Sequence, residues 1–426
     1  MKEYYQIAEV ADILGVSKET LRRWDKKGEL IPIRHPINNY RVYHISQLEH
    51  FEELQLLLNS MWDKEAKTKS KRRYKSIELF AGAGGLALGM ENAGFEHVLL
   101  SENNKDCCNT LKHNRPHWNV ICDDIADVYF QKYKKQVDFV SGGFPCQAFS
   151  YAGKKLGFED ARGTLFYEFA RCIDEVQPKI LLAENVRGLV SHENGRTLET
   201  IQSIINELGY TLISPRVLKA IFYKVPQKRE RLFLIGIRKD LYAKTLFEWP
   251  SPYNRIMTLR DAFYSGDLFL NDVPISPGQT YPIRKKEIMA HVPPGGYWRD
   301  LPEELQKEYM QKSFYLGGGK TGMARRLSLD EPSLTLTCAP AQKQTERCHP
   351  VETRPLTTRE YARIQTFPDD WVFTGSMSSI YKQIGNAVPV NLAAAVGRSV
   401  IRTLNLLEKS TRQAAKNYKE KEALDT

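Results

Sequence analysis

Residues 77–86 read IELFAGAGGL, and this stretch decides the fold that we expect. The apolar run from Ile77 to Phe80 predicts a strand, and Leu86–Asn92 follows with the spacing of a helix. The glycines between them permit a tight turn and bring the backbone close to a ligand at the helix N-terminus. The pattern G-x-G-x-x-G/A is met by Gly82, Gly84 and Ala87.

Strands and helices go on alternating beyond this turn. Phe166–Val176 has the periodicity of a helix, and four further short apolar runs predict strands. These runs are Val98–Ser101, Phe139–Ser141, Ile180–Ala183 and Phe233–Ile237. We therefore predict an α/β fold with a doubly wound, mostly parallel sheet. The alternation stops after Trp249, and helical periodicity returns in Thr358–Gln365 and Val388–Val400.

The composition of the 426-residue chain is that of a globular protein, with 42% hydrophobic and 26% charged residues. No run of 18 apolar residues occurs and the N-terminus lacks an apolar signal core, so we expect a cytoplasmic protein without a membrane helix. The seven cysteines lack the spacing of metal ligands, and we expect neither disulfides nor a metal site. The net charge of +10 fits a polyanionic partner, and equally a surface with spare lysines.

The first 58 residues have the pattern of a helix-turn-helix domain. Ile7–Leu14 has helical spacing, Gly15 can end that helix, and Ser17 can cap the next. The run INNYRVY over residues 37–43 predicts a β-wing. This stretch resembles the MerR-type winged helix domain, and the alternative is a three-helix scaffold without DNA contact. The resemblance and the exposed basic positions imply DNA contacts from Lys18, Arg22, Arg23 and Arg41.

Specialised loops follow the predicted strands at their carboxyl ends, where ligands bind in a doubly wound sheet. The loop GGFPCQAFS carries Cys146, and AENV carries Glu184. Arg229 and Arg231 in QKRER lie two positions apart, so in an extended chain they point the same way and can hold a carboxylate or a phosphate. We expect the other cysteines to be buried and inert. They are Cys107, Cys108, Cys122, Cys172, Cys338 and Cys348.

Two acidic residues and a glycine-punctuated segment complete the predicted site. Glu102 ends the second strand and can hold a ribose, while Asp124 can accept from an adenine amino group. These features fit a dinucleotide as well as S-adenosylmethionine. Residues 151–163, YAGKKLGFEDARG, have the composition of a lid over the substrate.

Taken together, the motifs F-x-G-x-G-G, P-C-Q, E-N-V, Q-x-R-x-R and Q-I-G-N-A-V resemble, in this order over residues 77–400, the DNA cytosine-5 methyltransferase family. The resemblance implies a DNA (cytosine-5-)-methyltransferase that uses S-adenosyl-L-methionine to methylate a flipped-out cytosine in a short duplex sequence. It implies a restriction–modification system as the setting. It also implies catalytic roles for Cys146, Glu184, Arg229 and Arg231.

The resemblance implies further contacts, residue by residue. For the cofactor these are Phe80, Gly82, Gly85, Leu86, Glu102, Asp124, Ile125, Gly142, Pro145, Leu165, Asn386 and Ala387. Asn103 departs from relatives that carry an apolar or aromatic residue against the adenine. Residues 354–371 would organise the target-recognition domain. In the region before them, the candidate DNA contacts are Arg325, Arg326, Gln342 and Arg347.

The predicted domains follow from these motifs. They are a MerR-like domain (1–60), a basic linker (61–76), a catalytic domain (77–253), an irregular target-recognition domain (254–375), a returning helix (376–408) and a polar tail (409–426). We expect catalysis by a monomer, with dimerisation through the N-terminal domain left open. That domain is also a candidate repressor of the system's own promoter. A GGNCC-like palindrome is our hypothesis for the target.

Three other functions compete with this one. A nicotinamide oxidoreductase fits Gly82, Gly84 and Glu102, but it leaves P-C-Q and E-N-V without a role. An RNA methyltransferase would use the same chemistry, but this function would leave the N-terminal domain without a role. A transcription regulator with an inactive catalytic half has no need for the complete set of motifs.

Overall fold

The computed structural model describes residues 2–145 and 164–424, with side chains up to residue 410, and forms two compact units. The first, which we call the recognition unit, gathers residues 1–64, 220–229 and 251–369. The second, the sheet unit, gathers residues 65–219, 230–250 and 370–426. Residues 220–229 thus join the recognition unit, although they lie inside the predicted catalytic domain. The predicted domain boundaries stay predictions.

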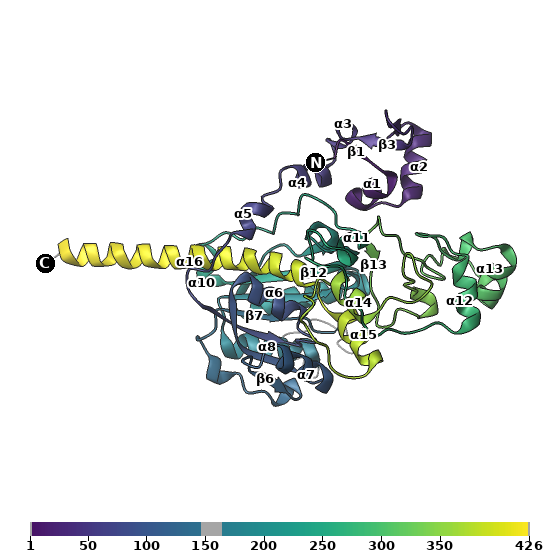
Figure 1. The fold of residues 1–426 in the computed structure, drawn as a ribbon. Helices are drawn as coiled ribbons and strands as arrows, with labels where there is room; N and C mark the ends of the chain where they lie inside the picture. The colour runs from purple at the N-terminus through teal and green to yellow at the C-terminus, as the bar shows by residue number, and fades with distance from the viewer. Residues whose placement is uncertain (1, 146–163, 425–426) are drawn as a thin grey trace. The chain divides into compact units, whose positions relative to one another are not determined.

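The sheet unit is built on one large sheet (Figure 1). Eight strands of the described residues form it, in the order β10-β12-β8-β7-β4-β5-β6, with β9 on β12. Their bounds are β4 (Tyr74–Leu79), β5 (Phe95–Glu102), β6 (Val120–Cys122), β7 (Phe139–Gly142), β8 (Ile180–Val186), β9 (Tyr210–Leu212), β10 (Arg216–Lys219) and β12 (Glu230–Arg238). All five strands predicted from the sequence are present, and the predicted α/β fold is confirmed.

The direction of the strands changes at β12. Strands β6, β5, β4, β7 and β8 are mutually parallel, whereas β12 runs antiparallel to β8, β9 and β10. A parallel pair needs a crossover, usually a helix, while antiparallel neighbours can be joined by a shorter chain. Residues 220–229 join β10 to β12 without an α-helix, in agreement with the antiparallel pairing.

Helices connect the parallel strands and supply the core. They are α6 (Gly85–Ala93), α7 (Lys105–Asn114), α8 (Leu165–Val176) and α9 (Arg196–Glu207). Fully buried apolar side chains from the sheet, such as Leu79 and Val140, pack with Phe169 of α8 and Ile201 of α9. The last helix, α16 (Val390–Leu424), is longer than the predicted stretch, because it continues through the predicted polar tail.

Helices α6 and α16 pack so closely that Gly89 is required between them. A Cβ at Gly89 would lie 2.3 Å from Cβ of Ala393 and 2.8 Å from the carbonyl oxygen of Val390. Gly89→Ala should therefore destabilise the sheet unit by about 1–3 kcal/mol, since overpacking outweighs the roughly 0.5–1 kcal/mol gained in helix propensity. The measurement is the midpoint of thermal unfolding. Gly188→Ala is the control, because its Cβ would meet nothing closer than 4.0 Å; equal midpoints for both variants would contradict the packing argument.

The N-terminal part of the recognition unit is a winged helix domain. Strand β1 (Tyr4–Tyr5) precedes helices α1 (Ile7–Leu14) and α2 (Lys18–Lys27), and β2 (Ile33–Arg34) and β3 (Arg41–His44) follow them; the three strands form one sheet in the order β1-β3-β2. Gly15 has φ 69° at the end of α1, and the Ser17 hydroxyl accepts the Thr20 N–H at 2.9 Å, as predicted. Two short helices, α3 (Ile45–Leu48) and α4 (Glu52–Leu58), follow the sheet.

The stretch predicted as a basic linker is largely structured. Helix α5 (Trp62–Ala66) opens it, and its last residues already belong to β4. Between them, the Arg72 guanidinium donates to Asp138 and, from Nε, to Glu408 at 2.7 Å. The Lys71 N–H donates to the Asn405 side chain at 3.0 Å. These contacts hold residues 71–72 against the sheet unit.

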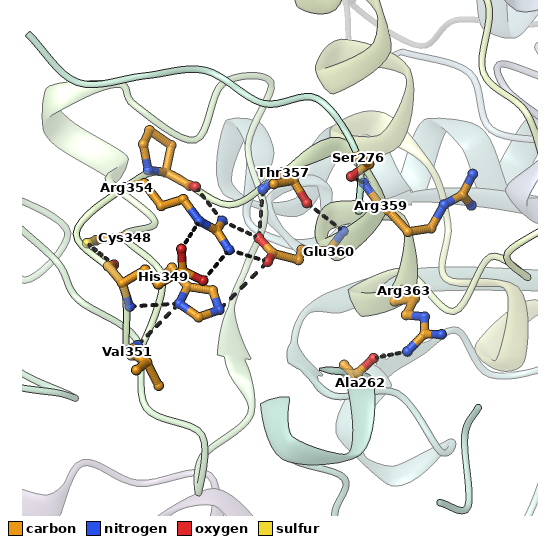
Figure 2. Close-up of polar contacts among 12 residues, drawn as sticks. Ala262, Ser276, Cys348, His349, Val351, Arg354, Thr357, Arg359, Glu360 and Arg363 are labelled. Atoms are coloured by element: carbon orange, nitrogen blue, oxygen red, sulfur yellow. Dashed lines mark hydrogen bonds and ion pairs between the residues drawn. The ribbon is translucent and has the colours of Figure 1, made fainter. Parts of the chain in front are cut away.

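The rest of the recognition unit has little regular structure, as the sequence predicts. It contains β11 (Gln227–Lys228), α11 (Leu259–Phe263), α12 (Ile283–Ala290), α13 (Glu303–Met310), β13 (Ser333–Leu334) and α14 (Thr358–Ile364). Polar groups of α14 hold the surrounding loops together (Figure 2). The buried Glu360 accepts from Arg354 at 2.7 and 2.9 Å, and the fully buried Arg363 donates to the Ala262 carbonyl at 3.1 Å.

One helical stretch of the described residues, Met377–Ser410, is long and apolar enough to be compared with a membrane span. It comprises α15 (Met377–Asn386) and the first part of α16. Of its apolar window, 83% is buried inside the protein, as in the core helix of a folded domain.

Candidate active site

The glycine-rich turn at the end of β4 has an unusual backbone. Phe80, Gly82 and Gly84 all have positive φ, of 58°, 53° and 88°. A phenylalanine in this region is strained, and such strain occurs mostly at functional sites. Helix α6 begins directly after the turn, at Gly85, and no side chain caps it. Its first N–H groups therefore point toward the space at the end of β4, where a helix N-terminus attracts negative or electron-rich groups.

Close packing explains two of the glycines. A Cβ at Gly84 would lie 2.7 Å from Leu111 and 3.0 Å from the ring of Trp371. A Cβ at Gly85 would lie 2.3 Å from the carbonyl oxygen of Val388. Leu86, the next residue, is buried. The turn therefore rests on residues from the C-terminal part of the chain.

Glu102 lies at the end of β5, as predicted, and its carboxylate organises the turn. Oε2 accepts the Gly82 N–H at 2.8 Å, and Oε1 accepts the N–H groups of Asn103 and Asn104 at 3.1 and 2.8 Å. The side chain remains partly exposed. Glu102 can therefore hold the turn and still present an acceptor to a ligand.

The other predicted cofactor residues have the following positions. Asp124 is exposed and caps a short helix by accepting the Ala126 N–H at 3.0 Å, and Ile125 is buried beside it. Leu165 is the first residue of α8 and is half-buried. Asn386 ends α15 and is exposed, and Ala387 is half-buried.

The loop after β7 is held in place by the neighbouring strand β8. Gly142 ends β7, and a Cβ at Gly143 would lie 2.8 Å from Oε2 of Glu184. The Asn185 side chain donates to the Phe144 carbonyl at 3.0 Å. Pro145 is exposed and is the last described residue of this loop. Cys146 and the predicted lid, residues 151–163, lie outside the described residues.

Glu184 and Arg231 form a buried ion pair at this edge of the sheet. In the antiparallel pairing of β8 with β12, Glu184 is opposite Phe233, so Arg231 lies diagonally across on the same face. The Arg231 Nε lies 2.8 Å from Oε1 of Glu184, and the two side chains are 12% and 10% exposed. Burial lowers the pKa of Arg231, and the attraction of Glu184 opposes that shift.

Arg229 lies between β11 and β12 and is grouped with the recognition unit. Its carbonyl accepts the Ala220 N–H at 2.8 Å, next to the antiparallel pairing of β10 with β12. The expectation that Arg229 and Arg231 point the same way stays a prediction. The Arg229 side chain is buried, and Nη1 donates to the Leu336 carbonyl at 3.3 Å. Within the sheet unit, Arg231 holds the predicted carboxylate of Glu184.

The structure separates the predicted DNA contacts into buried and exposed residues. Arg326 and Arg347 are 4% and 5% exposed, and their guanidinium groups donate to backbone carbonyls such as those of Met289 and Thr335. This corrects their interpretation, because donors used inside the fold do not reach a base. Arg325 is half-buried, and its Nε has no hydrogen-bond partner among the described residues. The exposed candidates are Gln342, Arg22, Arg23 and Arg41.

The remaining cysteines are only partly as predicted. Of the six that are described, none forms a disulfide, but Cys122 and Cys338 are exposed, so the expectation of burial is wrong for these two. Burial raises the pKa of Cys107 to about 12, which keeps its thiol protonated at neutral pH. Across the described ranges, no cluster of three or more His, Cys, Asp or Glu side chains is arranged for a metal ion.

Two contributors to the site were not assigned a role from the sequence. Asn185 fixes the loop that leads to Cys146, and its place directly after Glu184 was the available signal. Trp371 supports the glycine turn, is 1% exposed and lies under the Arg115 guanidinium at 5.3 Å. No sequence spacing connects Trp371 to a turn that lies almost 300 residues earlier.

A doubly wound sheet that carries an uncapped helix after β4, a carboxylate after β5 and a buried acid on β8 has the layout of an α/β methyltransferase. Comparison with known proteins agrees. Residues 74–402 match the family described as C-5 cytosine-specific DNA methylase, and residues 6–43 match the MerR family regulatory protein. The chain belongs to the C-5 cytosine-specific DNA methylase family, which confirms the assignment made from the motifs.

Individual relatives extend over nearly the whole chain. The Type II methyltransferase M.Eco47II of Escherichia coli is 66% identical over 96% of this chain and 98% of its own length. M.PspPI of Psychrobacter sp., also a Type II methyltransferase, is 60% identical over 95% of this chain and 98% of its own length. Among solved structures, the Entamoeba histolytica methyltransferase EhMeth has a TM-score of 0.55 at 15% identity, over 78% of this chain and 99% of that one, which shows the shared fold.

Proposed function

We propose that this chain transfers a methyl group from S-adenosyl-L-methionine to C5 of a flipped-out cytosine in a short duplex sequence, as the modifying enzyme of a Type II restriction–modification system. The observation that carries the proposal is the buried Glu184–Arg231 pair beside the loop that leads to Cys146. Family membership and the two Type II relatives support the reaction and its setting. Such an enzyme acts in the bacterial cytoplasm, where the DNA is.

The residues at the ends of β4 and β5 fit S-adenosylmethionine. The N–H groups at the start of α6 are not used by a cap, and Glu102 has an exposed edge for ribose hydroxyl groups. Asp124 and Ile125 lie after β6, the next parallel strand, where they would meet an adenine. Gly142 and Pro145 would line the methionine side, Phe80 would contribute from the glycine-rich turn, and Leu165 would lie beside the adenine. Bound at this edge, S-adenosylmethionine supplies an electrophilic methyl group.

A substitution at Glu102 tests this cofactor site. Glu102→Gln keeps the size of the side chain but replaces one acceptor oxygen with a donor, so a contact to Gly82 or to the ribose is lost. Since a hydrogen bond to a charged group is worth about 1.5–3 kcal/mol, the Kd for S-adenosylmethionine should rise about ten- to hundredfold. Isothermal titration calorimetry measures it. Glu96→Gln on the same strand is exposed and serves as the control; an unchanged Kd in Glu102→Gln would remove Glu102 from the site.

Cytosine chemistry requires a nucleophile before methylation, because C5 alone reacts weakly. The Cys146 thiolate would form a bond to C6, and the electron pair of the C5–C6 double bond would move toward C5 and N3. C5 would then bond to the methyl carbon while the bond from that carbon to the sulfonium sulfur breaks, and the electron pair of the broken bond stays on the sulfur of the departing thioether. Loss of the C5 proton to a base and cleavage of the S–C6 bond restore the aromatic ring and the thiolate. Since a stacked cytosine is out of reach, the base must be flipped out, which costs a few kcal/mol.

Glu184 and Arg231 would hold the flipped base. The Glu184 carboxylate, held 2.8 Å from the Arg231 Nε, would accept from the exocyclic amine. Donation to N3 then requires a proton that arrives as the base binds. Arg231 keeps the carboxylate oriented, and Arg229 would contact the base or its phosphate.

The DNA partner would be recognised by the exposed and half-buried polar residues, not by the buried arginines. Arg325 and Gln342 are our candidates for base contacts in the target-recognition region, and Lys18, Arg22, Arg23 and Arg41 for contacts by the N-terminal domain. A GGNCC-like palindrome remains our hypothesis for the target, with a monomer as the catalytic species. Bisulfite-type sequencing of plasmid DNA methylated by the protein identifies the target and the modified cytosine.

One experiment tests the proposed function as a whole. Purified protein is incubated with labelled S-adenosylmethionine and either duplex DNA or RNA. We expect label at C5 of cytosine in DNA only, and no label with Cys146→Ser. Label in RNA would favour the RNA methyltransferase alternative, and binding to DNA without label would favour the inactive regulator.

A further inference from the structure

The winged helix domain is fastened to the target-recognition region by a cluster of four charged side chains within the recognition unit. The Nζ of Lys18, the first residue of α2, lies 2.6 Å from Oε1 of Glu331. The Nζ of Lys228 in β11 lies 2.7 Å from Oδ1 of Asp12 in α1 and 4.0 Å from Oε2 of Glu331. Asp12 and Glu331 are only 10% and 19% exposed, so these pairs are partly shielded from water.

Apolar and polar contacts reinforce the same attachment. Phe222 and Ile256, from the two segments that follow in the recognition unit, pack against the core of the winged helix domain. The Ser60 hydroxyl donates to the Pro252 carbonyl. The rings of Trp62 and Tyr253 meet edge to face, with centroids 5.5 Å apart. A core shared in this way does not allow the domain to act as a separate module on a flexible tether.

The cluster also touches the residues that we assign to target recognition. Glu331 interacts electrostatically with Arg325, the half-buried arginine with an unpartnered Nε. Lys228 directly precedes Arg229 in the sequence and pairs, through β11, with β13. The first turn of α2 is therefore next to the segment that carries the candidate base contact.

This position limits where α2 can meet DNA. A recognition helix contacts bases mainly with its N-terminal residues. In α2 that end is Lys18, which abuts Glu331, while Arg22 and Arg23 on the following turns are exposed. A duplex that meets α2 must therefore continue onto the target-recognition region. The Arg22 and Arg41 side chains are 62% and 66% exposed, and their pairs with Glu19 at 3.1 Å and with Asp25 at 3.6 Å lie at the surface, where an ion pair contributes little.

We propose that the winged helix domain binds the DNA that flanks the methylation target, in the same complex and on one side of the target only, as a fixed part of the recognition unit. This inference rests on the proposed function, and it extends the DNA contact of the protein beyond the target sequence. It differs from a repressor that occupies a separate promoter site. A monomer carries one such domain, so the added contact should extend about ten base pairs, one helical turn, to one side.

The test uses duplexes that are hemimethylated at the target, so that only one strand accepts a methyl group and the enzyme binds in one orientation. The flank on each side of the target is either about four or about fifteen base pairs long, and the two flanks are varied independently. For the unmodified protein, lengthening one flank should lower the KM for DNA about tenfold, and lengthening the other should change it little. At higher salt this advantage should shrink, because phosphate contacts release counterions.

Charge variants assign this effect to the domain. Arg22→Glu combined with Arg23→Glu should give the same KM on long and short flanks. Lys132→Glu combined with Lys134→Glu is the matched control, since these exposed residues lie on the sheet unit; it should keep the flank advantage. Lys18→Glu should reduce the flank advantage, because it breaks the ion pair with Glu331. Adding Glu331→Lys re-forms the pair with reversed charges and should restore the advantage. Neither a misfolded protein nor a simple loss of charge would be rescued in this way.

The outcomes separate this inference from the proposed function. If the Arg22→Glu/Arg23→Glu protein retains the flank advantage, or if the unmodified protein shows none on either side, the inference is wrong while methylation of short duplexes still supports the proposed function. Protection of a distant promoter without a flank effect would also overturn it, in favour of a separate repressor site. Absence of methylation on every duplex would count against the proposed function itself.

Discussion

Cys146→Ala is expected to abolish methyl transfer while binding of duplex DNA survives. Without the thiol no bond forms to C6, C5 stays a weak nucleophile, and the methyl group has no acceptor. The loss should exceed that of any other single substitution, because Cys146 is the only residue to which the proposed mechanism assigns the bond to C6. Incorporation of labelled methyl groups into DNA measures the first property, and a gel-shift titration measures the second.

A trapping experiment supplies the positive counterpart. DNA with 5-fluorocytosine at the target should form a covalent complex with the unmodified protein, because fluorine cannot leave C5 as a proton does. The complex should survive denaturation and be absent with Cys146→Ala. Turnover by that variant, in a preparation free of the unmodified enzyme, would refute the covalent mechanism.

Glu184→Gln should slow the chemical step by about 10²- to 10⁴-fold, the usual contribution of a positioned acid–base group. The amide keeps the size of the side chain, but it cannot exchange a proton with N3, and it loses the ion pair to the Arg231 guanidinium. Affinity for S-adenosylmethionine should change little, since Glu184 belongs to the base. Single-turnover methylation and calorimetric titration of the cofactor separate these two effects.

The control for this prediction is Glu199→Gln, a residue of α9 in the same unit that lies away from the ion pair. It should leave both the single-turnover rate and the cofactor affinity unchanged. If Glu184→Gln instead weakens cofactor binding strongly and retains a normal single-turnover rate, Glu184 would have to be moved to the cofactor site.

The sheet and the edge that carries the site were predictable because they rest on local patterns. Apolar runs identified the strands, and the parallel order follows from helices between them, so the sequence alone places Glu102 and Glu184 at carboxyl ends of strands. The pairing of Glu184 with Arg231 was not predictable. It depends on the register of β12 against β8, and that strand reverses direction after a connection that belongs to the other unit.

The target-recognition region was less predictable for a different reason. Arg325 and Arg326 are neighbours in the sequence but differ in exposure: Arg325 is half-buried, whereas Arg326 is buried and its guanidinium donates to backbone carbonyls such as that of Met289. Loops without periodicity give no sign of which side faces inward. The ion pair between Lys18 and Glu331 joins residues 313 positions apart, and no local signal reports such a contact.

The contact of Gly85 with the Val388 carbonyl also has a consequence for biosynthesis. The turn that would receive the cofactor is translated almost 300 residues before the residues that support it, Trp371 and Val388. A nascent chain therefore holds an incomplete pocket until Val388 has emerged, since contacts of such long sequence separation form late. Each molecule would begin to modify DNA only after that point, and a chain cut short before Trp371 would have the Cys146 and Glu184 motifs of the enzyme without a working site.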